Sequence, residues 1–371
     1  MDVLLNYVLP FLVILTILVF VHEMGHFWVA RVNNVRVEVF SVGFGPEIFG
    51  FHDKHGTRWK FAAIPLGGYV KMFGEGETVD DEENERELTD EEKEVSFFHK
   101  RLGQRTAVVA AGPAANFIFA IFVMALLFAI SGAPKPLAGI GSILTGSAAE
   151  EAGLEIGDRI FSINDEEIKW FDDLSRIVSA SPGRTLMLGV ARGDTELTLQ
   201  ATPKSRAADS ESKEGEVRGI LGVSPHPDLV EYETYGPLQA TWKAVERTYD
   251  LSATILSYLG EMITGSRTSK ELGGPLRIAH FSGEMFQGGW VNTFFFLAVL
   301  SVNLGLINLF PIPMLDGGHL VFYAAEAVLG RPIGPKAQEY SFRFGLILVL
   351  LIMIYATWND LEFFKILDFA N

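Results

Sequence analysis

Four long apolar runs divide the chain, at residues 4–30, 106–130, 290–309 and 341–358. A helix needs about 20 consecutive apolar residues to cross a hydrocarbon core of about 30 Å. We therefore expect a polytopic α-helical membrane protein with about four transmembrane helices. The first run lacks the basic leading region and the small-residue cleavage site of a signal peptide, so we expect it to be a retained span.

Lysine and arginine gather at one set of span ends, which predicts how the spans are oriented. They follow the first run, precede the second, and lie between the third and fourth: Arg31, Arg36, Lys100, Arg101, Arg105, Arg331, Lys336 and Arg343. Cytoplasmic loops carry an excess of Lys and Arg. These segments should therefore face the cytoplasm, with both chain ends and the segment between the second and third spans outside.

Residues 32–105 contain two segments that alternate apolar and polar residues around the turn-forming sequence Asp53-Lys54-His55-Gly56. This pattern predicts a β-hairpin. Because the hairpin follows a span directly, we expect it to be associated with the membrane, with its backbone groups satisfied by protein. The acidic run at residues 75–94 is expected to be a solvated loop without a function.

The outer segment, residues 133–225, is predicted to be a small β-rich domain. Its sequence GSAAEEAGLEIGDRIFSIN, residues 146–164, predicts a turn, a short helix ending at Gly153, a second turn at Gly157-Asp158 and a strand. This signature resembles the PDZ family. The resemblance implies that a partner's C-terminal strand adds to an edge of the sheet.

Residues 226–288 carry apolar side chains at helical spacing, interrupted by charged ones that disfavour a span. We expect an amphipathic helical region that lies on the outer membrane surface or packs against the PDZ-like domain. An ordinary soluble amphipathic helix fits the same pattern equally well.

The charge and the absence of cysteine limit the partners and the metal ligands that the chain can have. The net charge of −16 argues against a nucleic-acid partner, since such a protein needs clustered Lys and Arg to neutralise phosphates. The chain has no cysteine, so a bound metal would be held by His, Asp or Glu.

The sequence HEMGH, from His22 to His26, is an HExxH motif at the end of the first span. Residues four apart share one face of a helix, so both imidazoles can reach one metal while Glu23 meets a metal-bound water. Ionisable residues at membrane depth cost at least about 2.5 to 3.5 kcal/mol each, and a divalent cation compensates for them. The alternative, that these residues only end the span, is weaker because apolar residues continue after them.

A catalytic zinc site has three protein ligands and an open position for water. The third ligand is expected to be Asp316, in NLFPIPMLDGGHL. Pro311 and Pro313 break the helix there and Gly317-Gly318 allows a tight turn, and a broken helix at membrane depth is tolerated only where it lines a cavity. His319 is a rival ligand that could equally cap the following helix.

Taken together, HEMGH, AGPAAN (residues 111–116), the PDZ-like domain and NLFPIPMLDGG resemble the site-2 protease family of intramembrane metalloproteases. The similarity is greatest to the bacterial regulator of sigma-E protease group and covers essentially the whole chain. It implies one zinc ion held by His22, His26 and Asp316, with Glu23 as the general base. It also implies substrate contacts from Asn303, Asn308 and the hairpin residues Gly43, Gly45, Gly67 and Gly68. The best-known members of the group carry two tandem PDZ domains, whereas one is found here.

The resemblance further implies regulated intramembrane proteolysis in the bacterial inner membrane. The substrate would be a single-span membrane protein, such as an anti-sigma factor already shortened by a first protease. Two other interpretations stay open. A PDZ-bearing scaffold with a structural metal would need a fourth ligand, for which His319 is the candidate, and a transporter would show internal repeats, which are not seen.

The expected domain order is as follows: first span with HExxH, 1–31; cytoplasmic-side hairpin and acidic loop, 32–105; second span, 106–131; PDZ domain, 133–225; amphipathic region, 226–288; third span with LDG motif, 289–320; fourth span, 341–358.

Overall fold

The computed structural model describes residues 2–74, 88–207, 217–266 and 268–365. The chain forms two compact units, one made of Met1–Leu127 with Pro237–Asn371 and the other of Phe128–Gly236. Most of the expected acidic loop lies outside the described residues. Its described end is not a loop but the short helix α2 (Asp90–Val95), because Thr89 and Glu92 form a capping box there.

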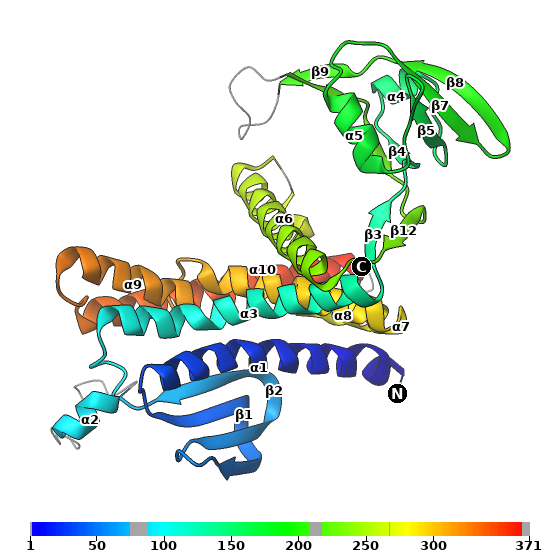
Figure 1. Ribbon diagram of the computed structural model, residues 1–371. Helices are drawn as coiled ribbons and strands as arrows, with labels where there is room; N and C mark the ends of the chain where they lie inside the picture. The colour runs from blue at the N-terminus through cyan, green and yellow to red at the C-terminus, as the bar shows by residue number, and fades with distance from the viewer. Residues whose placement is uncertain (1, 75–87, 208–216, 267, 366–371) are drawn as a thin grey trace. The chain divides into compact units, whose positions relative to one another are not determined.

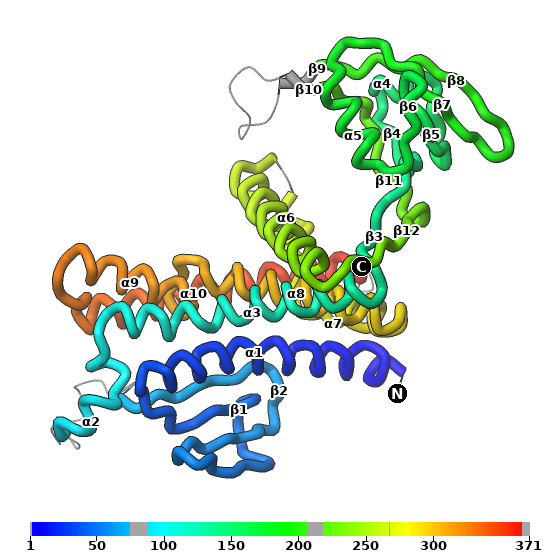
Figure 2. Tube along the Cα trace, viewed as in Figure 1, coloured from blue at the N-terminus to red at the C-terminus, as the bar shows by residue number. Residues whose placement is uncertain are grey.

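Four long apolar helices dominate the first unit: α1 (Leu9–Val32, preceded by the π-helical turn Leu4–Val8), α3 (Leu102–Ile130), α8 (Trp290–Leu309) and α10 (Pro335–Phe363). Each is long and apolar enough to cross a membrane, and each covers one of the four predicted runs, α1 together with the π-helical turn before it. Figures 1 and 2 show them running along one another. The polytopic helical architecture expected from the hydrophobic pattern is present.

This unit also contains α6 (Pro237–Thr264), the 3-10 turn Ser269–Glu271, α7 (Pro275–Gln287) and α9 (Asp316–Leu329). The third span is shorter than the predicted range 289–320. Helix α8 ends at Leu309 because the two prolines that follow cannot continue it, and Asp316 opens α9 instead.

The predicted turn at Gly317-Gly318 is wrong, since both glycines belong to the first turn of α9. Their lack of side chains serves close packing. A Cβ at Gly317 would lie 2.2 Å from the Phe310 carbonyl oxygen, and one at Gly318 would lie 2.5 Å from that of Ile312. The broken segment can therefore fold back against the start of α9.

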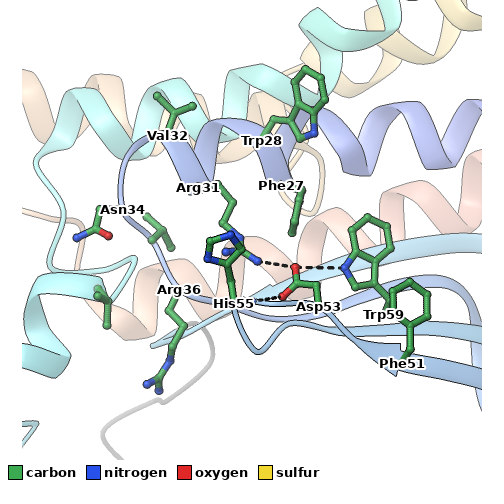
Figure 3. A pocket seen from close by; sticks show the side chains of 12 residues that line it. Phe27, Trp28, Arg31, Val32, Asn34, Arg36, Phe51, Asp53, His55 and Trp59 are labelled. Atoms are coloured by element: carbon green, nitrogen blue, oxygen red, sulfur yellow. Dashed lines mark hydrogen bonds and ion pairs between the residues drawn. The ribbon is translucent and has the colours of Figure 1, made fainter.

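The expected hairpin is present as β1 (Val37–His52) and β2 (Arg58–Met72), which pair antiparallel. Asp53 closes its turn by accepting hydrogen bonds from the backbone N–H groups of His55 and Thr57. It also forms an ion pair with Arg31 on α1 at 2.7 Å (Figure 3). Partial burial opposes ionisation of Asp53, but these donors outweigh it and lower its pKa. The turn is thereby fastened to the end of α1.

A hollow of about 900 Å³ lies beside this turn, lined by Phe27, Trp28, Phe51 and Trp59 among others (Figure 3). Aromatic side chains and the Arg31–Asp53 pair make up much of its wall. It is separate from the cluster of ionisable residues described below.

The second unit is β-rich. Its elements are β3 (Ala133–Pro136), β4 (Ile140–Ile143), α4 (Ala148–Glu151), β5 (Arg159–Ile163), β6 (Glu166–Glu167), α5 (Phe171–Ser179), β7 (Leu186–Arg192), β8 (Thr195–Ala201), β9 (Lys204–Ala207), β10 (Val217–Ile220), β11 (Val223–Pro225) and β12 (Val230–Glu233). Strands β6-β5-β7-β8 form one sheet, and fully buried Ile160, Leu188 and Val190 lie in its core. Gly153, predicted to end the short helix, and Gly157, predicted in the second turn, have φ of +76° and +94°, values that favour glycine.

The boundary of this unit differs from the predicted one. The unit does not end at residue 225, because β12 pairs with β3 and so returns the chain to the start of the unit. The helical region correspondingly begins at Pro237 rather than at residue 226.

Candidate active site

Three predicted metal ligands from two distant parts of the sequence converge in the first unit. His22 and His26 lie one turn apart on α1, and Asp316 is the first residue of α9. The Oδ2 atom of Asp316 is 3.2 Å from Nε2 of His22 and 3.5 Å from Nε2 of His26, and the two Nε2 atoms are 3.2 Å apart. Among the described residues, these are the ligand atoms that converge closely enough to hold a metal ion.

The spacing of these atoms suits zinc. Ligands about 2.0 to 2.1 Å from a tetrahedral zinc ion lie roughly 3.3 Å from one another, which matches the three measured separations. Asp316 Oδ2 is buried and faces the two imidazole nitrogens, but it makes no well-formed hydrogen bond with the described residues. A buried carboxylate oxygen without a partner is costly, and a cation bound between it and the two imidazoles removes that cost. Three ligands leave the fourth position open for water.

Glycines on α1 and α3 allow the histidines to lie against the neighbouring helix. A Cβ at Gly112 would lie 2.3 Å from Nε2 of His26 and 2.8 Å from Cε1 of His22, so any side chain at residue 112 would displace both rings. A Cβ at Gly25 would lie 2.2 Å from the carbonyl oxygen of Ala111. The two helices therefore approach to backbone contact at the level of the site.

Helix α3 also contacts the far side of both rings. The backbone carbonyl of Val108 lies 2.9 Å from Nδ1 of His26, and the side-chain amide of Asn116 lies 3.1 Å from Nδ1 of His22. Ligating histidines usually use the second ring nitrogen in such bonds, which fix the orientation of the ring.

A cavity of about 620 Å³ opens onto this cluster. Its walls come from α1, β2, α3, α8, α9 and α10, and include Glu23, Gly68, Tyr69, Val70, Arg105, Asn308, Met314, His319, Tyr323, Glu326, Gln338 and Phe342. Glu23, the predicted general base, thus lines the same cavity as the three predicted ligands. The backbone amide of Val70 interacts with its carboxylate.

Of the predicted substrate contacts, Asn308 and Gly68 line the cavity. A Cβ at Gly68 would lie 3.3 Å from Cγ of Glu23, so a bare backbone lets strand β2 pass close to the base. Asn303, half-buried on α8, is not among the described residues that line the cavity.

The other three hairpin glycines also lie outside the lining. Gly43, Gly45 and Gly67 have φ of +91°, +84° and +136°. This backbone conformation explains why glycine occupies these positions, and it bends the hairpin without placing them at the cluster.

His319 lines the cavity, but it is not one of the three residues whose ligand atoms converge. Its ring packs against Phe342, with centroids 5.2 Å apart. The structure therefore places the carboxylate of Asp316, and not this imidazole, beside the two histidines.

Comparison with known proteins agrees with this geometry. The model of peptidase family M50 matches residues 10–352. The chain belongs to peptidase family M50. It is a metalloprotease, and the names of its relatives indicate zinc as the metal of the family.

Relatives of this M50 peptidase cover nearly its whole length. A protein of Rhizobium meliloti named as a candidate zinc metalloprotease is 43% identical over 364 residues, covering 96% of this chain and 97% of the relative. One of Agrobacterium fabrum, named in the same way, is 42% identical over 362 residues and covers 96% of each. The regulator of sigma-E protease of Salmonella typhimurium is 33% identical over 449 residues, covering 94% of this chain and 97% of that protein.

Among solved structures, a PDZ domain of Listeria monocytogenes aligns with 26% of this chain and 92% of its own, at 20% identity and a TM-score of 0.20. A score this low carries no argument about the second unit.

Several residues of this M50 peptidase's site did not follow from sequence reasoning. Asn116 and Gly112 were part of a recognised motif, but only the packing of α3 on α1 shows that they touch the histidines. Arg105 and Glu326, far apart in the sequence, face each other across the cavity wall. Two charged residues near helix ends carry no sequence signal for such a pairing.

Proposed function

We propose that this metalloprotease hydrolyses peptide bonds within or beside transmembrane segments of single-span membrane proteins. His22, His26 and Asp316 hold one zinc ion per chain, and Glu23 is the general base. The observation that carries the proposal is the convergence of three ligand atoms, at tetrahedral spacing, in a unit built from helices that can cross a membrane.

When bound there, zinc makes a coordinated water acidic and polarises the scissile carbonyl. Glu23 accepts the proton from the attacking water and returns it to the leaving amine. Its carboxylate is suited to this work because it lines the same cavity and lies on the α1 turn that carries both histidines.

A helical substrate must unwind first, because its carbonyl groups are occupied by intrahelical hydrogen bonds. The edge of β2 from Gly68 to Val70 passes through the cavity wall and offers backbone groups to an extended segment. Asn308 lies in the same wall and can hydrogen-bond the substrate backbone. Asn303 would contribute from a position five residues earlier on α8. Gly43, Gly45 and Gly67 act in this proposal by shaping the hairpin that presents the edge.

The distribution of basic residues supports an orientation of the site in the membrane. The basic residues at the ends of the spans favour a bacterial inner-membrane protein whose active site faces the cytoplasm and whose second unit is periplasmic. In that orientation the hairpin lies at the membrane, where its exposed Phe44, Ile48 and Phe49 would meet lipid. The second unit acts as a PDZ domain that inspects substrates, and a shortened anti-sigma factor is the substrate class suggested by the relative named regulator of sigma-E protease.

The test uses the full chain purified in detergent and a tagged single-span substrate that lacks most of its outer domain. Wild type should cut within or near the span, and a strong zinc chelator should abolish the cut until zinc is restored. Glu23→Gln should retain zinc and lose cleavage. Glu339→Gln, an exposed carboxylate on α10, is the matched control and should cleave normally.

A different result would contradict the proposal. If wild type retains zinc and cleaves none of several such substrates, the metal is structural and the chain acts as a membrane scaffold. That outcome would call for a fourth protein ligand at the metal.

A further inference from the structure

Asn116 is a fully buried polar residue inside an apolar helix, α3. Its Nδ2 atom lies 3.1 Å from Nδ1 of His22, while its Oδ1 atom is buried and has no hydrogen-bond partner in the described chain. Its backbone carbonyl accepts a hydrogen bond of 2.8 Å from the hydroxyl of Ser301, which is fully buried on α8. An asparagine held on both sides at membrane depth requires an explanation, since burying an amide that is only partly hydrogen-bonded is costly.

The protonation of the His22 imidazole explains why a polar residue is buried at this position. A neutral imidazole carries its single proton on one of its two ring nitrogens. For Nε2 of His22 to offer a lone pair to a metal, the proton must be on Nδ1, which then needs a hydrogen-bond acceptor. For His26 that acceptor is present, because the Val108 carbonyl lies 2.9 Å from its Nδ1. For His22, Asn116 is the group in that place.

An amide nitrogen facing Nδ1 would donate to it and force the proton onto Nε2, where it would block the metal. A half turn of the Asn116 amide about its last bond exchanges oxygen and nitrogen without changing the shape of the side chain. In either orientation one amide atom of Asn116 lacks a partner among the described residues, so burial does not choose between them. The orientation with the amide oxygen toward Nδ1 is selected because it leaves a lone pair on Nε2 of His22.

We propose that Asn116 is a positioning residue for the metal centre: its amide oxygen accepts the Nδ1 proton of His22 and so keeps Nε2 of that ring free for zinc. The Ser301 hydrogen bond holds Asn116 at the right height on α3. This inference rests on the proposed metal site. Loss of such an outer partner typically lowers metal affinity by about 10- to 100-fold.

The experiment measures zinc affinity of the full chain in detergent by competition with a coloured chelator, together with the visible spectrum of the Co²⁺-substituted protein. Asn116→Leu keeps the approximate volume but offers no acceptor, and should bind zinc about 10- to 100-fold more weakly. Asn116→Asp can only accept, and should bind zinc as tightly as wild type or more tightly, with an unchanged Co²⁺ spectrum. Asn292→Leu, at an exposed asparagine on α8, is the matched control and should leave the affinity unchanged.

The Asn116→Asp variant decides the question even if Asn116→Leu does not fold. Should Asn116 act instead as a donor to His22, a carboxylate in its place could not donate and zinc affinity would fall, which would overturn the proposal. Wild-type affinity in Asn116→Leu would overturn it as well. These readouts are independent of proteolysis, so a chain that binds zinc but never cleaves would refute the proposed function and leave this inference standing. A wild-type chain that binds no zinc would refute both.

Discussion

Arg105 of α3 and Glu326 of α9 form an ion pair in the cavity wall, with side chains only 11% and 16% exposed. The guanidinium also lies 5.0 Å from the centroid of the Tyr323 ring. Because Asp316, the proposed third ligand, is the first residue of α9, this ion pair joins that helix to α3, which packs against the two histidines.

Removing one member of this pair should destabilise the protein. Glu326→Gln leaves the Arg105 charge largely buried without its partner, and such changes cost about 3 to 5 kcal/mol. Glu339→Gln breaks the exposed Arg343–Glu339 pair on α10, which is worth about 1 kcal/mol or less. Thermal unfolding in detergent should show a clear drop for the first variant and almost none for the second. Equal effects would mean that the Arg105 pair is as solvated as the surface one.

Gly112→Ala should disrupt the metal site, because the new methyl group would overlap both imidazoles. We expect zinc affinity to fall by at least about tenfold, as for loss of an outer-shell partner. Gly103→Ala is the control on the same helix, since a Cβ there meets no atom within 4 Å. It should leave zinc binding intact and stabilise the helix by up to about 1 kcal/mol. Zinc titration and thermal unfolding distinguish the two, and normal affinity in Gly112→Ala would contradict the packing described for α1 and α3.

Asp360 caps α7 from the end of α10 and is fully buried. Its carboxylate accepts hydrogen bonds from the backbone N–H groups of Gly274, Leu276 and Arg277 at 2.9, 3.0 and 3.1 Å. Asp360→Asn turns an amide N–H group toward these donors and should cost about 1 to 3 kcal/mol.

Hydrogen exchange should locate that loss at the start of α7. Glu362→Gln, further along α10 and paired on the surface with Lys270, should not change exchange there. Unchanged protection of α7 in Asp360→Asn would show that the cap contributes little.

The second unit should be sensitive to acid through Asp158. Burial of this carboxyl opposes its ionisation, but hydrogen bonds from Arg192 and from the Glu155 N–H outweigh that cost and lower its pKa. A pKa that is lower in the folded than in the unfolded chain stabilises the fold above the unfolded value of about 3.9. That contribution is lost as the pH falls through the folded pKa.

Hydrogen exchange of the full chain, corrected for the intrinsic rate at each pH, tests this. Wild-type protection of the strand β5 should fall below about pH 4, the ordinary range of a free carboxyl. Asp158→Asn should start with less protection at neutral pH and lose less of it on acidification. Asp194→Asn, at an exposed turn, should behave as wild type. If Asp158→Asn keeps the full acid response, other carboxyl groups cause it.

The helices, and the position of His22 and His26 on one helix face, could be predicted because they depend on local sequence. Long apolar runs give spans wherever they occur, and residues four apart share a helix face whatever the surroundings, so His22 and His26 followed from their spacing alone. Asp316 could be singled out because few carboxyl groups lie in a segment broken by prolines.

Other features depend on tertiary contacts and had no local signal. The second unit extends beyond the predicted residue 225 because β12 pairs with β3, and nothing in the sequence of residues 230–233 identifies their partner strand. The role of Gly317 was misjudged for a related reason. A glycine pair permits either a turn or a close approach of two segments, and only the fold-back of the Phe310 carbonyl decides which.

The close approach of Gly25 to Ala111 has a mechanical consequence. At this level there is no room for a side chain between the two helices, so we expect both imidazoles and their α3 neighbours to move together as one platform. Asp316 reaches that platform from a separate helix, after an irregular segment. A zinc ion bound there would act as a removable cross-link that closes a very long loop of chain. Its withdrawal should loosen the beginning of α9 while α1 and α3 remain joined.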